Sequence, residues 1–173
     1  VKKLVIMGGA VHVPGNVTSF AEANFWNDPH AADKVLSADW NIDLIGLDVT
    51  ATIQFPPDVF SQIAKASPRI GGFIYDICEF YIDFYEKIVV KRVFLMNYPD
   101  ALLAICDRDI FTFQNEPLSV IVEGEEVGNS IVSENTLRRA VSVAVGVDVD
   151  AAKKRFMAIL AEADSACDKR VNS

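Results

Sequence analysis

A short apolar run followed by two glycines, close to the start of the chain, limits the possible folds most. Leu4 to Met7 carry only large apolar side chains, and Gly8 and Gly9 follow directly. An uninterrupted apolar run of this length is typical of a strand in a parallel sheet, where both faces are covered. Glycine lets the backbone turn sharply and lets another group approach it closely. The segment therefore predicts an α/β fold with a ligand-binding edge just after Met7, because ligands bind in open α/β sheets beyond the carboxyl ends of the strands.

Three polar side chains follow this turn and are the best candidates for ligand contacts: Asn16, Glu22 and Asn24. An asparagine amide both donates and accepts hydrogen bonds, and a glutamate offers two acceptor oxygens, which together suit a ligand rich in hydroxyl groups. The alternative, and the more common role for such residues, is that they cap turns and a helix start. Asp28 followed by Pro29 predicts a helix start, because Asp is a favoured N-cap and Pro a favoured first helical residue.

The rest of the chain alternates between helical spacing of apolar residues and short apolar runs. We expect strands at 42–50, 118–123, 129–133 and 138–145, and helices at 28–38, 58–66, 69–87, 101–106 and 148–164. The last two strands are expected to form a small antiparallel addition near the C-terminus. The predicted fold is a single domain over residues 1–173, with an open, mostly parallel, Rossmann-like sheet and helices on both faces.

Composition excludes several classes of partner. The chain has 173 residues, a formal net charge of -8 and an apolar fraction of 51%. The apolar content indicates a large buried sheet or an apolar interface, and the negative charge argues against nucleic-acid binding. No apolar run reaches membrane-spanning length, and no secretory signal pattern is present. Three widely spaced cysteines, Cys78, Cys106 and Cys167, indicate reduced thiols, so we expect a cytoplasmic protein without a membrane partner.

Two further features allow more than one interpretation. The segment 69–87 is rich in aromatic residues, which favours core packing or a subunit interface. Asp100 stands at the start of the apolar segment 101–106, where a carboxylate is a helix cap in most proteins and a metal ligand in some. The chain also begins without Met and enters its first strand almost at once, so we expect it to be the later part of a longer protein.

Several motifs, in this order and spacing, resemble the inosine–uridine nucleoside hydrolase family. They are Val5-Ile6-Met7-Gly8-Gly9-Ala10, Gly15-Asn16, Ala21-Glu22-x-Asn24, Asp28-Pro29-x-Ala31-Ala32 and Leu47-Asp48-Val49-Thr50. Weaker matches follow at Pro99-Asp100-Ala101-Leu102 and Val147-Asp148-Val149-Asp150. Together these segments cover nearly the whole chain, and the part through residue 29 is the most specific.

The resemblance implies a function and a set of roles. Members of the family cleave the N-glycosidic bond of ribonucleosides in nucleoside breakdown and purine salvage, with a Ca²⁺ ion that binds the ribose hydroxyls and the attacking water. By position, Asn16 and Glu22 correspond to groups that hold the ribose 5′-hydroxyl, and Asn24 to the group on the lower hydroxyls. Met7 corresponds to a residue that lines the ribose pocket, and Asp100 to a metal ligand. A nucleoside or ribose is therefore the expected ligand.

Two departures from the family pattern limit what this chain is expected to do alone. The family's N-terminal Asp cluster, which supplies the general base and most metal ligands, has no counterpart here. The histidine that helps the base to leave is replaced by Pro99, or by Tyr98 if the alignment slips by one residue. Neither protonates a leaving base as histidine does near neutral pH. We therefore assign no catalytic residue and expect the chain to be inactive by itself.

The expected whole protein is a Ca²⁺-dependent ribonucleoside hydrolase, of which this chain is the carboxyl-terminal portion. Two alternatives stay open: a non-catalytic nucleoside- or ribose-binding relative, and a structural subunit. A homo-oligomer, or association with a missing N-terminal half, is expected in either case.

Overall fold

The computed structural model describes residues 1–56, 58–89, 94–135 and 137–171. Its contacts divide the chain into two compact units. The first unit contains Val1–Thr52 and Asn97–Asp148, and the second contains Ile53–Met96 and Val149–Ser173. Every residue that the family resemblance singled out as a site residue lies in the first unit.

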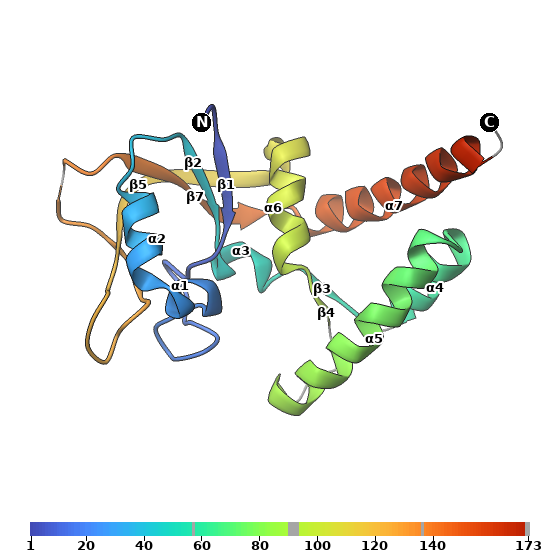
Figure 1. Ribbon diagram of the computed structural model, residues 1–173, viewed down its shortest axis with the longest axis horizontal. Coiled ribbons are helices and arrows are strands. Elements are labelled where there is room, and N and C mark those ends of the chain that lie inside the picture. Colours follow the sequence, from blue (N-terminus) through green and yellow to red (C-terminus); the bar gives the residue numbers. More distant parts are fainter. Residues whose placement is uncertain (57, 90–93, 136, 172–173) are drawn as a thin grey trace. The chain divides into compact units, whose positions relative to one another are not determined.

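A five-stranded sheet forms the centre of the first unit (Figure 1). In spatial order its strands are β1 (Leu4–Met7), β2 (Ile42–Ile45), β7 (Ala140–Val147), β5 (Phe111–Val120) and β6 (Ser130–Val132). The strands β1, β2 and β7 run parallel, with Leu4 opposite Ile42, whereas β5 is antiparallel to both β7 and β6. The predicted α/β class, with an antiparallel part contributed by the later strands, is confirmed.

Helices cover both faces of this sheet. They are α1 (Ala23–Asn27), α2 (Pro29–Leu36), α3 (Leu47–Thr50), α6 (Asn97–Cys106) and the 3₁₀ helix η1 (Arg108–Ile110). Helix α2 contacts β5, whereas α6 contacts β1 and β2 and lies on the other side of β1 in Figure 1. The Asp28 side chain accepts the Ala31 N–H at 2.9 Å, and Pro29 is the first helical residue, as predicted.

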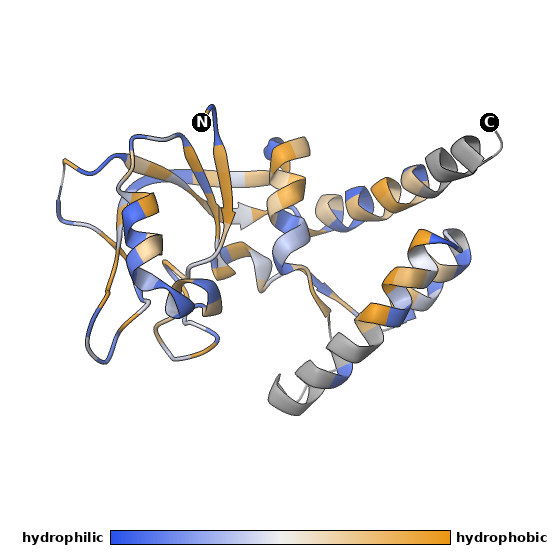
Figure 2. Ribbon diagram, in the orientation of Figure 1, coloured by the Kyte–Doolittle hydropathy of each residue, from blue (hydrophilic) through white to orange (hydrophobic). Residues whose placement is uncertain are grey.

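The core of the first unit lies between the sheet and helices α1 and α2. Alternate residues of β2 and β7 point to this side, because successive side chains of a strand face opposite ways. The buried cluster consists of Phe25, Leu36, Ile42, Leu44, Leu118, Val120, Val141 and Val143. Figure 2 shows the corresponding hydrophobic colouring along β1 and β2.

The second unit is built around phenylalanine rings. Its elements are β3 (Gln54–Phe55), α4 (Asp58–Ala66), α5 (Ile70–Val89), β4 (Phe94–Leu95) and α7 (Val149–Val171). The Phe60 ring meets that of Phe94 edge to face at 4.8 Å between centroids, and the Phe55 ring lies 5.7 Å from that of Phe156. The helices expected at 58–66 and 69–87 are therefore present, and α7 continues past the expected end at residue 164 to Val171.

Two predicted elements differ from the structure in the region that forms the site. Residues Leu47–Thr50 form a helical turn, not the second half of a strand, because Gly46 O accepts the N–H groups of Val49 and Thr50. The short helix α1 occupies part of what reads as a polar loop, since the buried Glu22 side chain caps it. In both places the residue before the segment, Gly46 or Glu22, is the N-cap of a short helix of four or five residues.

Two strands differ as well. Strand β5 begins at Phe111 and not at residue 118, because Gln114, Asn115 and Glu116 make its first part too polar to recognise as a strand. Strand β7, expected to belong to a small antiparallel addition, is antiparallel to β5 but also pairs in parallel with β2, so it lies inside the main sheet.

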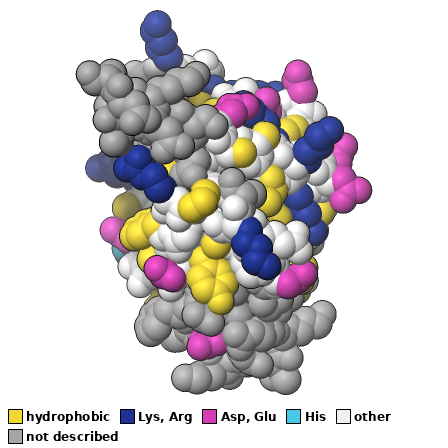
Figure 3. Space-filling model, turned by 90° about the vertical axis from the view of Figure 1, so that its right-hand side faces the viewer, with side chains coloured by type: hydrophobic (Ala, Val, Ile, Leu, Met, Phe, Trp, Pro, Cys, Tyr) yellow, Lys and Arg dark blue, Asp and Glu magenta, His cyan; other side chains and the backbone are white. Residues whose placement is uncertain are grey.

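Charged side chains of both signs lie on the described surface. On the face drawn in Figure 3, acidic and basic side chains of the described residues are interspersed with hydrophobic ones. Among the described helices, none is long and apolar enough to cross a bilayer. Cys78 is a buried free thiol whose pKa is raised to about 11 by burial, and Cys106 is an exposed free thiol. The side chain of Cys167 lies outside the described residues.

Candidate functional site

The candidate site residues gather where β1 and β2 end at their carboxyl side. The loop after β1 and the helix after β2 are tied together there: Leu47 N–H donates to Gly9 O at 2.9 Å. The Asp48 carboxylate accepts the N–H groups of Val11 and His12 at 3.0 and 2.8 Å. Two adjacent parallel strands thus hold their following loops as one surface, at the sheet edge where α/β proteins bind ligands.

The two glycines after β1 are required by this geometry. Gly9 has a φ of +78°, a conformation that residues with a side chain adopt rarely. A Cβ atom on Gly8 would lie 2.7 Å from a ring carbon of Phe25, which is buried in the core. The glycine pair therefore lets the backbone after β1 approach α1 closely enough to meet Glu22.

Glu22 is buried and organises the loop through backbone N–H groups. Its Oε2 accepts from Gly9 N at 3.0 Å and from Phe25 N at 3.3 Å, and its Oε1 accepts from Asn24 N at 2.9 Å. The side chain is 1% exposed. The capping role left open by the sequence is therefore present, and three of the roughly four acceptor positions of the carboxylate are occupied by backbone N–H groups.

Asn16 lies at the exposed side of the same loop. Its Oδ1 accepts the Ala23 N–H at 3.0 Å, and its own backbone N–H donates to Ala21 O at 3.1 Å. The loop therefore folds back on the start of α1, so that Asn16 and Glu22 both contact the first residues of that helix.

Asn24 connects three parts of the site. Its Nδ2 donates to Met7 Sδ at 3.2 Å and to Met7 O at 3.4 Å. Its Oδ1 accepts a hydrogen bond from the Tyr98 hydroxyl at 3.1 Å. The amide is thereby oriented with its NH₂ group toward β1 and its oxygen toward α6. Met7, Asn24 and Tyr98 are thus together in the structure, although the resemblance linked Tyr98 only to the missing histidine.

Asp100 is a titratable group in an unusual environment. It is fully buried in the first turn of α6, and neither carboxylate oxygen has a hydrogen-bond partner. Burial raises the pKa of Asp100 to about 8. A buried carboxylate is costly unless it is neutralised or binds a cation, so these two orphaned oxygens suit a metal ligand.

Two more buried oxygens lack partners near this helix. Asn97 Oδ1 lies on the same face of α6 as Asp100, three residues away, and Thr50 Oγ1 lies at the end of α3, which contacts α6. Ca²⁺ takes six to eight oxygen ligands in most sites. In the described ranges no group of three or more His, Cys, Asp or Glu side chains is placed to hold a metal. Among the described residues, Asp100 therefore suits one metal ligand, and the other acids do not complete a Ca²⁺ site around it.

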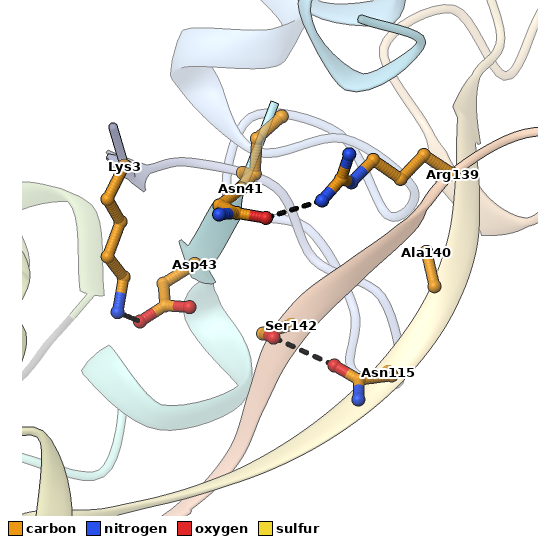
Figure 4. Close-up of a pocket in the computed structure, with 8 residues that line it drawn as sticks. Lys3, Asn41, Asp43, Asn115, Arg139, Ala140 and Ser142 are labelled. Carbon is orange, nitrogen blue, oxygen red and sulfur yellow. Dashed lines mark hydrogen bonds and ion pairs between the residues drawn. The ribbon is translucent and has the colours of Figure 1, made fainter. Parts of the chain in front are cut away.

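A pocket of about 490 Å³ lies at the amino ends of β1, β2 and β7, away from these residues (Figure 4). Its side wall contains Asp43, whose carboxylate is bound by Lys3 at 2.6 Å and by Arg108 at 2.8 Å. Burial acts to raise the pKa of Asp43, but the hydrogen bonds from Arg108 and Lys3 outweigh it and hold the pKa below its ordinary value. The charges that line this pocket are already paired, and we place the candidate functional site at the carboxyl ends of the strands.

Three residues that the structure places here have no site role predicted from the sequence: Asp48, Asn97 and Thr50. Asp48 and Thr50 lie in the Leu47–Thr50 segment, which has the polar residues expected after a buried strand but reads as part of that strand. Asn97 gave no signal beyond its position ahead of the apolar segment of α6.

Comparison with known proteins identifies the family. The family described as inosine-uridine preferring nucleoside hydrolase matches residues 1–154. The chain belongs to this family. The resemblance carried by the Met7-Gly8-Gly9 and Asp28-Pro29 motifs is therefore confirmed.

Individual members of the nucleoside hydrolase family agree with this. Uridine nucleosidase 1 of Arabidopsis thaliana is 30% identical over 160 residues, covering 87% of this chain and 48% of the relative. The inosine-uridine preferring nucleoside hydrolase of Leishmania major is 31% identical over 124 residues, covering 72% of this chain and 39% of the relative. The solved purine-preferring ribonucleoside hydrolase from Gardnerella vaginalis superposes with a TM-score of 0.87 at 31% identity, covering 94% of this chain and 52% of that one. The chain thus spans about half the length of these nucleoside hydrolases and matches the carboxyl-terminal part of the family.

Proposed function

We propose that this chain provides the ribose-holding part of a ribonucleoside hydrolase, which splits the N-glycosidic bond to give ribose and a free base. The observation that carries the proposal is Asp100, a fully buried carboxylate with two unpartnered oxygens and a pKa raised to about 8. A group in this state is costly to the fold, and a cation at the site would offset that cost. Membership of the nucleoside hydrolase family supports the same role.

The ribose would be held between the loop after β1 and helix α1. Glu22 has one acceptor position left beyond its three backbone partners, and the neighbouring Asn16 stands at the exposed rim, so both suit the 5′-hydroxyl. Asn24, with an amide oriented by Met7 and Tyr98, suits the lower hydroxyls of the ring. Met7 offers an apolar surface to the sugar ring at the end of β1.

In this proposal Asp100 is one ligand of the Ca²⁺ ion. When bound, such an ion would lower the pKa of a coordinated water and hold the ribose hydroxyls. The remaining ligands and the general base would come from carboxylates of a preceding half, because the described residues hold no other acid beside Asp100 in a metal-binding group. The isolated chain is therefore proposed to bind ribose without cleaving nucleosides.

The groups that would protonate the departing base are also incomplete in this chain. The Tyr98 hydroxyl donates to Asn24, and the residue as a whole is 65% exposed, whereas Pro99 has no group that donates a proton. A tyrosine hydroxyl can donate a hydrogen bond to a departing base but does not protonate it as a histidine does. We propose that Tyr98 orients Asn24 and that leaving-group protonation depends on groups outside this chain.

The test is an assay of ribose release from uridine and inosine. The purified chain alone should release none above background. Mixed with the N-terminal half of the Gardnerella vaginalis hydrolase and Ca²⁺, it should become active, and Asp100→Asn should abolish this activity while the exposed control Glu125→Gln retains it. Ribose release by the chain alone would overturn the proposed division of labour. An Asp-x-Asp-x-x-x-Asp-Asp pattern upstream of Val1 in the same reading frame would support the enzyme independently.

A second candidate is a ribose- or nucleoside-binding protein without activity. The absence of a metal-binding group of three acids, His or Cys among the described residues favours it. Calorimetric binding of ribose, together with no turnover in any complemented mixture, would distinguish it from the enzyme. If Glu22→Ala left ribose binding unchanged, a purely structural subunit would be favoured instead. Self-association is proposed in each case, with sedimentation as its measurement.

A further inference from the structure

Ser130, the first residue of strand β6, is bound to the loop that follows β1. Its Oγ accepts the N–H of Ala10 at 2.9 Å and donates to the carbonyl oxygen of Ala10 at 3.1 Å. A hydroxyl group can do both because it is a donor and an acceptor at once. Both residues are buried, so these hydrogen bonds are shielded from water. One side chain, 120 residues away in the sequence, therefore binds both backbone polar groups of Ala10.

The hydrogen bonds of Ser130 help to fix the peptide unit between Gly9 and Ala10. The Gly9 carbonyl oxygen accepts the Leu47 N–H at 2.9 Å, and the Ala10 N–H donates to Ser130. Because a peptide unit is planar, holding both its oxygen and its nitrogen leaves it one orientation. On the other side of its Cα atom, Gly9 donates its own N–H to Glu22 Oε2 at 3.0 Å. The direction of the Gly9 N–H, at a φ of +78°, therefore depends on the peptide unit that Ser130 holds.

The two residues just before Ser130 also pack next to Glu22. Asn129 forms an antiparallel bridge with Ala21, which directly precedes Glu22. Gly128 has a φ of +85°, and a Cβ atom there would lie 3.0 Å from the Cβ of Ala21. This short segment thus contacts both of the parts that Glu22 joins, the loop after β1 and the start of α1.

We propose that Ser130 is a positioning residue of the ribose site and acts through Gly9 on the carboxylate of Glu22. With the Gly9 N–H held in place, Glu22 Oε2 has a fixed partner, and this fixes the orientation of the carboxylate that would meet the 5′-hydroxyl. The lower hydroxyls should not depend on Ser130, because the side chain of Asn24 is oriented by β1 and α6. The ligand in this inference rests on the proposed function, whereas the effect of Ser130 on Gly9 is measured without a ligand.

The first experiment measures amide hydrogen exchange in the ligand-free chain by NMR. Ser130→Ala removes both hydrogen bonds to Ala10. The Gly9 amide, whose own acceptor Glu22 is unchanged, should then exchange roughly tenfold faster, while the Leu44 amide in the central strand β2 stays protected. Unchanged exchange at Gly9 would overturn the proposal. Equal acceleration at Gly9 and Leu44 would also overturn it, because only the global stability would then have changed.

Ser130→Cys provides a second variant in case Ser130→Ala does not fold. A cysteine keeps the shape of the serine side chain but is a weak donor and acceptor. Its Gly9 amide should therefore also exchange faster than that of the parent. Parent-like exchange at Gly9 in a folded Ser130→Cys variant would overturn the proposal, because filling the space would then be enough.

The second experiment compares the binding of uridine and 5′-deoxyuridine by calorimetry. The two ligands differ only in the 5′-hydroxyl, which is the group that Glu22 is proposed to hold. Ser130→Ala should weaken uridine binding by roughly tenfold and leave 5′-deoxyuridine binding unchanged. Ser142→Ala is the matched control, because it removes a serine hydrogen bond, to Asn115 Oδ1 at 2.8 Å, at the amino ends of the strands. It should change neither affinity.

The two ligands separate a positioning role from a merely structural one. Equal weakening for both ligands would overturn the proposal, because Ser130 would then support the whole site and not its 5′ end. A parent chain that binds the two ligands equally, or binds neither, would overturn the proposed ribose contacts instead. The exchange of Gly9 would still show whether Ser130 orients its N–H, so the two failures are distinguishable.

Discussion

The Tyr98 hydroxyl donates a hydrogen bond to Asn24 Oδ1 at 3.1 Å, linking α6 to α1 across 74 residues of sequence. The same amide donates to Met7 at the end of β1. An amide held at both its oxygen and its nitrogen has one orientation, which determines what a ligand meets. Tyr98 therefore acts on the proposed ribose site through Asn24.

Tyr98→Phe should loosen this amide without disturbing the core, because the ring is largely exposed. The expected loss of folding stability is about 0.5–1 kcal/mol, the ordinary net value of an accessible hydrogen bond. Denaturant unfolding measures that loss, and NMR of the Asn24 side-chain NH₂ group should show increased mobility. A sharp, unshifted Asn24 signal in the variant would contradict the orienting role.

Asp100→Asn should stabilise the metal-free chain in a pH-dependent way. The pKa of Asp100 is raised to about 8 in the folded protein and is about 3.8 when unfolded. Between these values the folded state binds the extra proton, so the stability of the parent falls as pH rises, by up to about 1.4 kcal/mol per pH unit. Asp100→Asn has no carboxyl group to titrate, so the difference in folding stability between the variant and the parent should grow from pH 4 to pH 8. Thermal unfolding across that range measures it.

A control variant and the addition of Ca²⁺ test the Asp100 prediction further. The exposed Glu125→Gln should show no such growing advantage. Added Ca²⁺ should stabilise the parent and not Asp100→Asn if the carboxylate binds the ion. An advantage of Asp100→Asn that stays constant between pH 4 and pH 8 would mean that the Asp100 carboxyl does not titrate in this range.

Asp43→Asn should destabilise the fold by about 1–3 kcal/mol, because it removes the charge from a buried acceptor of two cationic partners. The pKa of Asp43 is lowered from 3.8 in the folded state, so its stabilisation is present above about pH 3.8. It is lost as the pH falls through the lower, folded value, and the parent and variant should then converge. Asp39→Asn, at an exposed partner of Arg139, should cost under about 1 kcal/mol. Equal losses for the two variants in urea unfolding would show that the burial of Asp43 contributes nothing.

Glu22→Ala should cost about 2–4 kcal/mol, because it leaves three N–H groups near the core without their acceptor. Asp28→Ala removes an exposed N-cap with one such bond and should cost about 1 kcal/mol. Urea unfolding compares the two caps. A similar cost for both would indicate that water replaces the Glu22 carboxylate, and that its burial is not essential to the loop.

Local patterns in the sequence were enough for the elements whose causes are local. The apolar run ending at Met7, the glycine pair and the Asp28-Pro29 helix start each appear in the structure where they were expected. The same patterns misread Leu47–Thr50, since a Gly46 cap turns apolar residues of a strand-like run into a helical turn. They also missed the first part of β5, because its polar residues find partners on β7.

The sequence by itself determined the family, the α/β class and the candidate residues Met7, Asn16, Glu22, Asn24 and Asp100, whose roles stay predictions. Only the tertiary structure decided that Asp100 is buried with both oxygens unpartnered, that Glu22 is occupied by three backbone N–H groups, and that Tyr98 orients Asn24. The physical reason is the distance along the sequence over which each property is determined. Strand and helix starts depend on neighbours within a few residues, whereas burial, pKa and amide orientation depend on side chains brought together from distant parts of the chain.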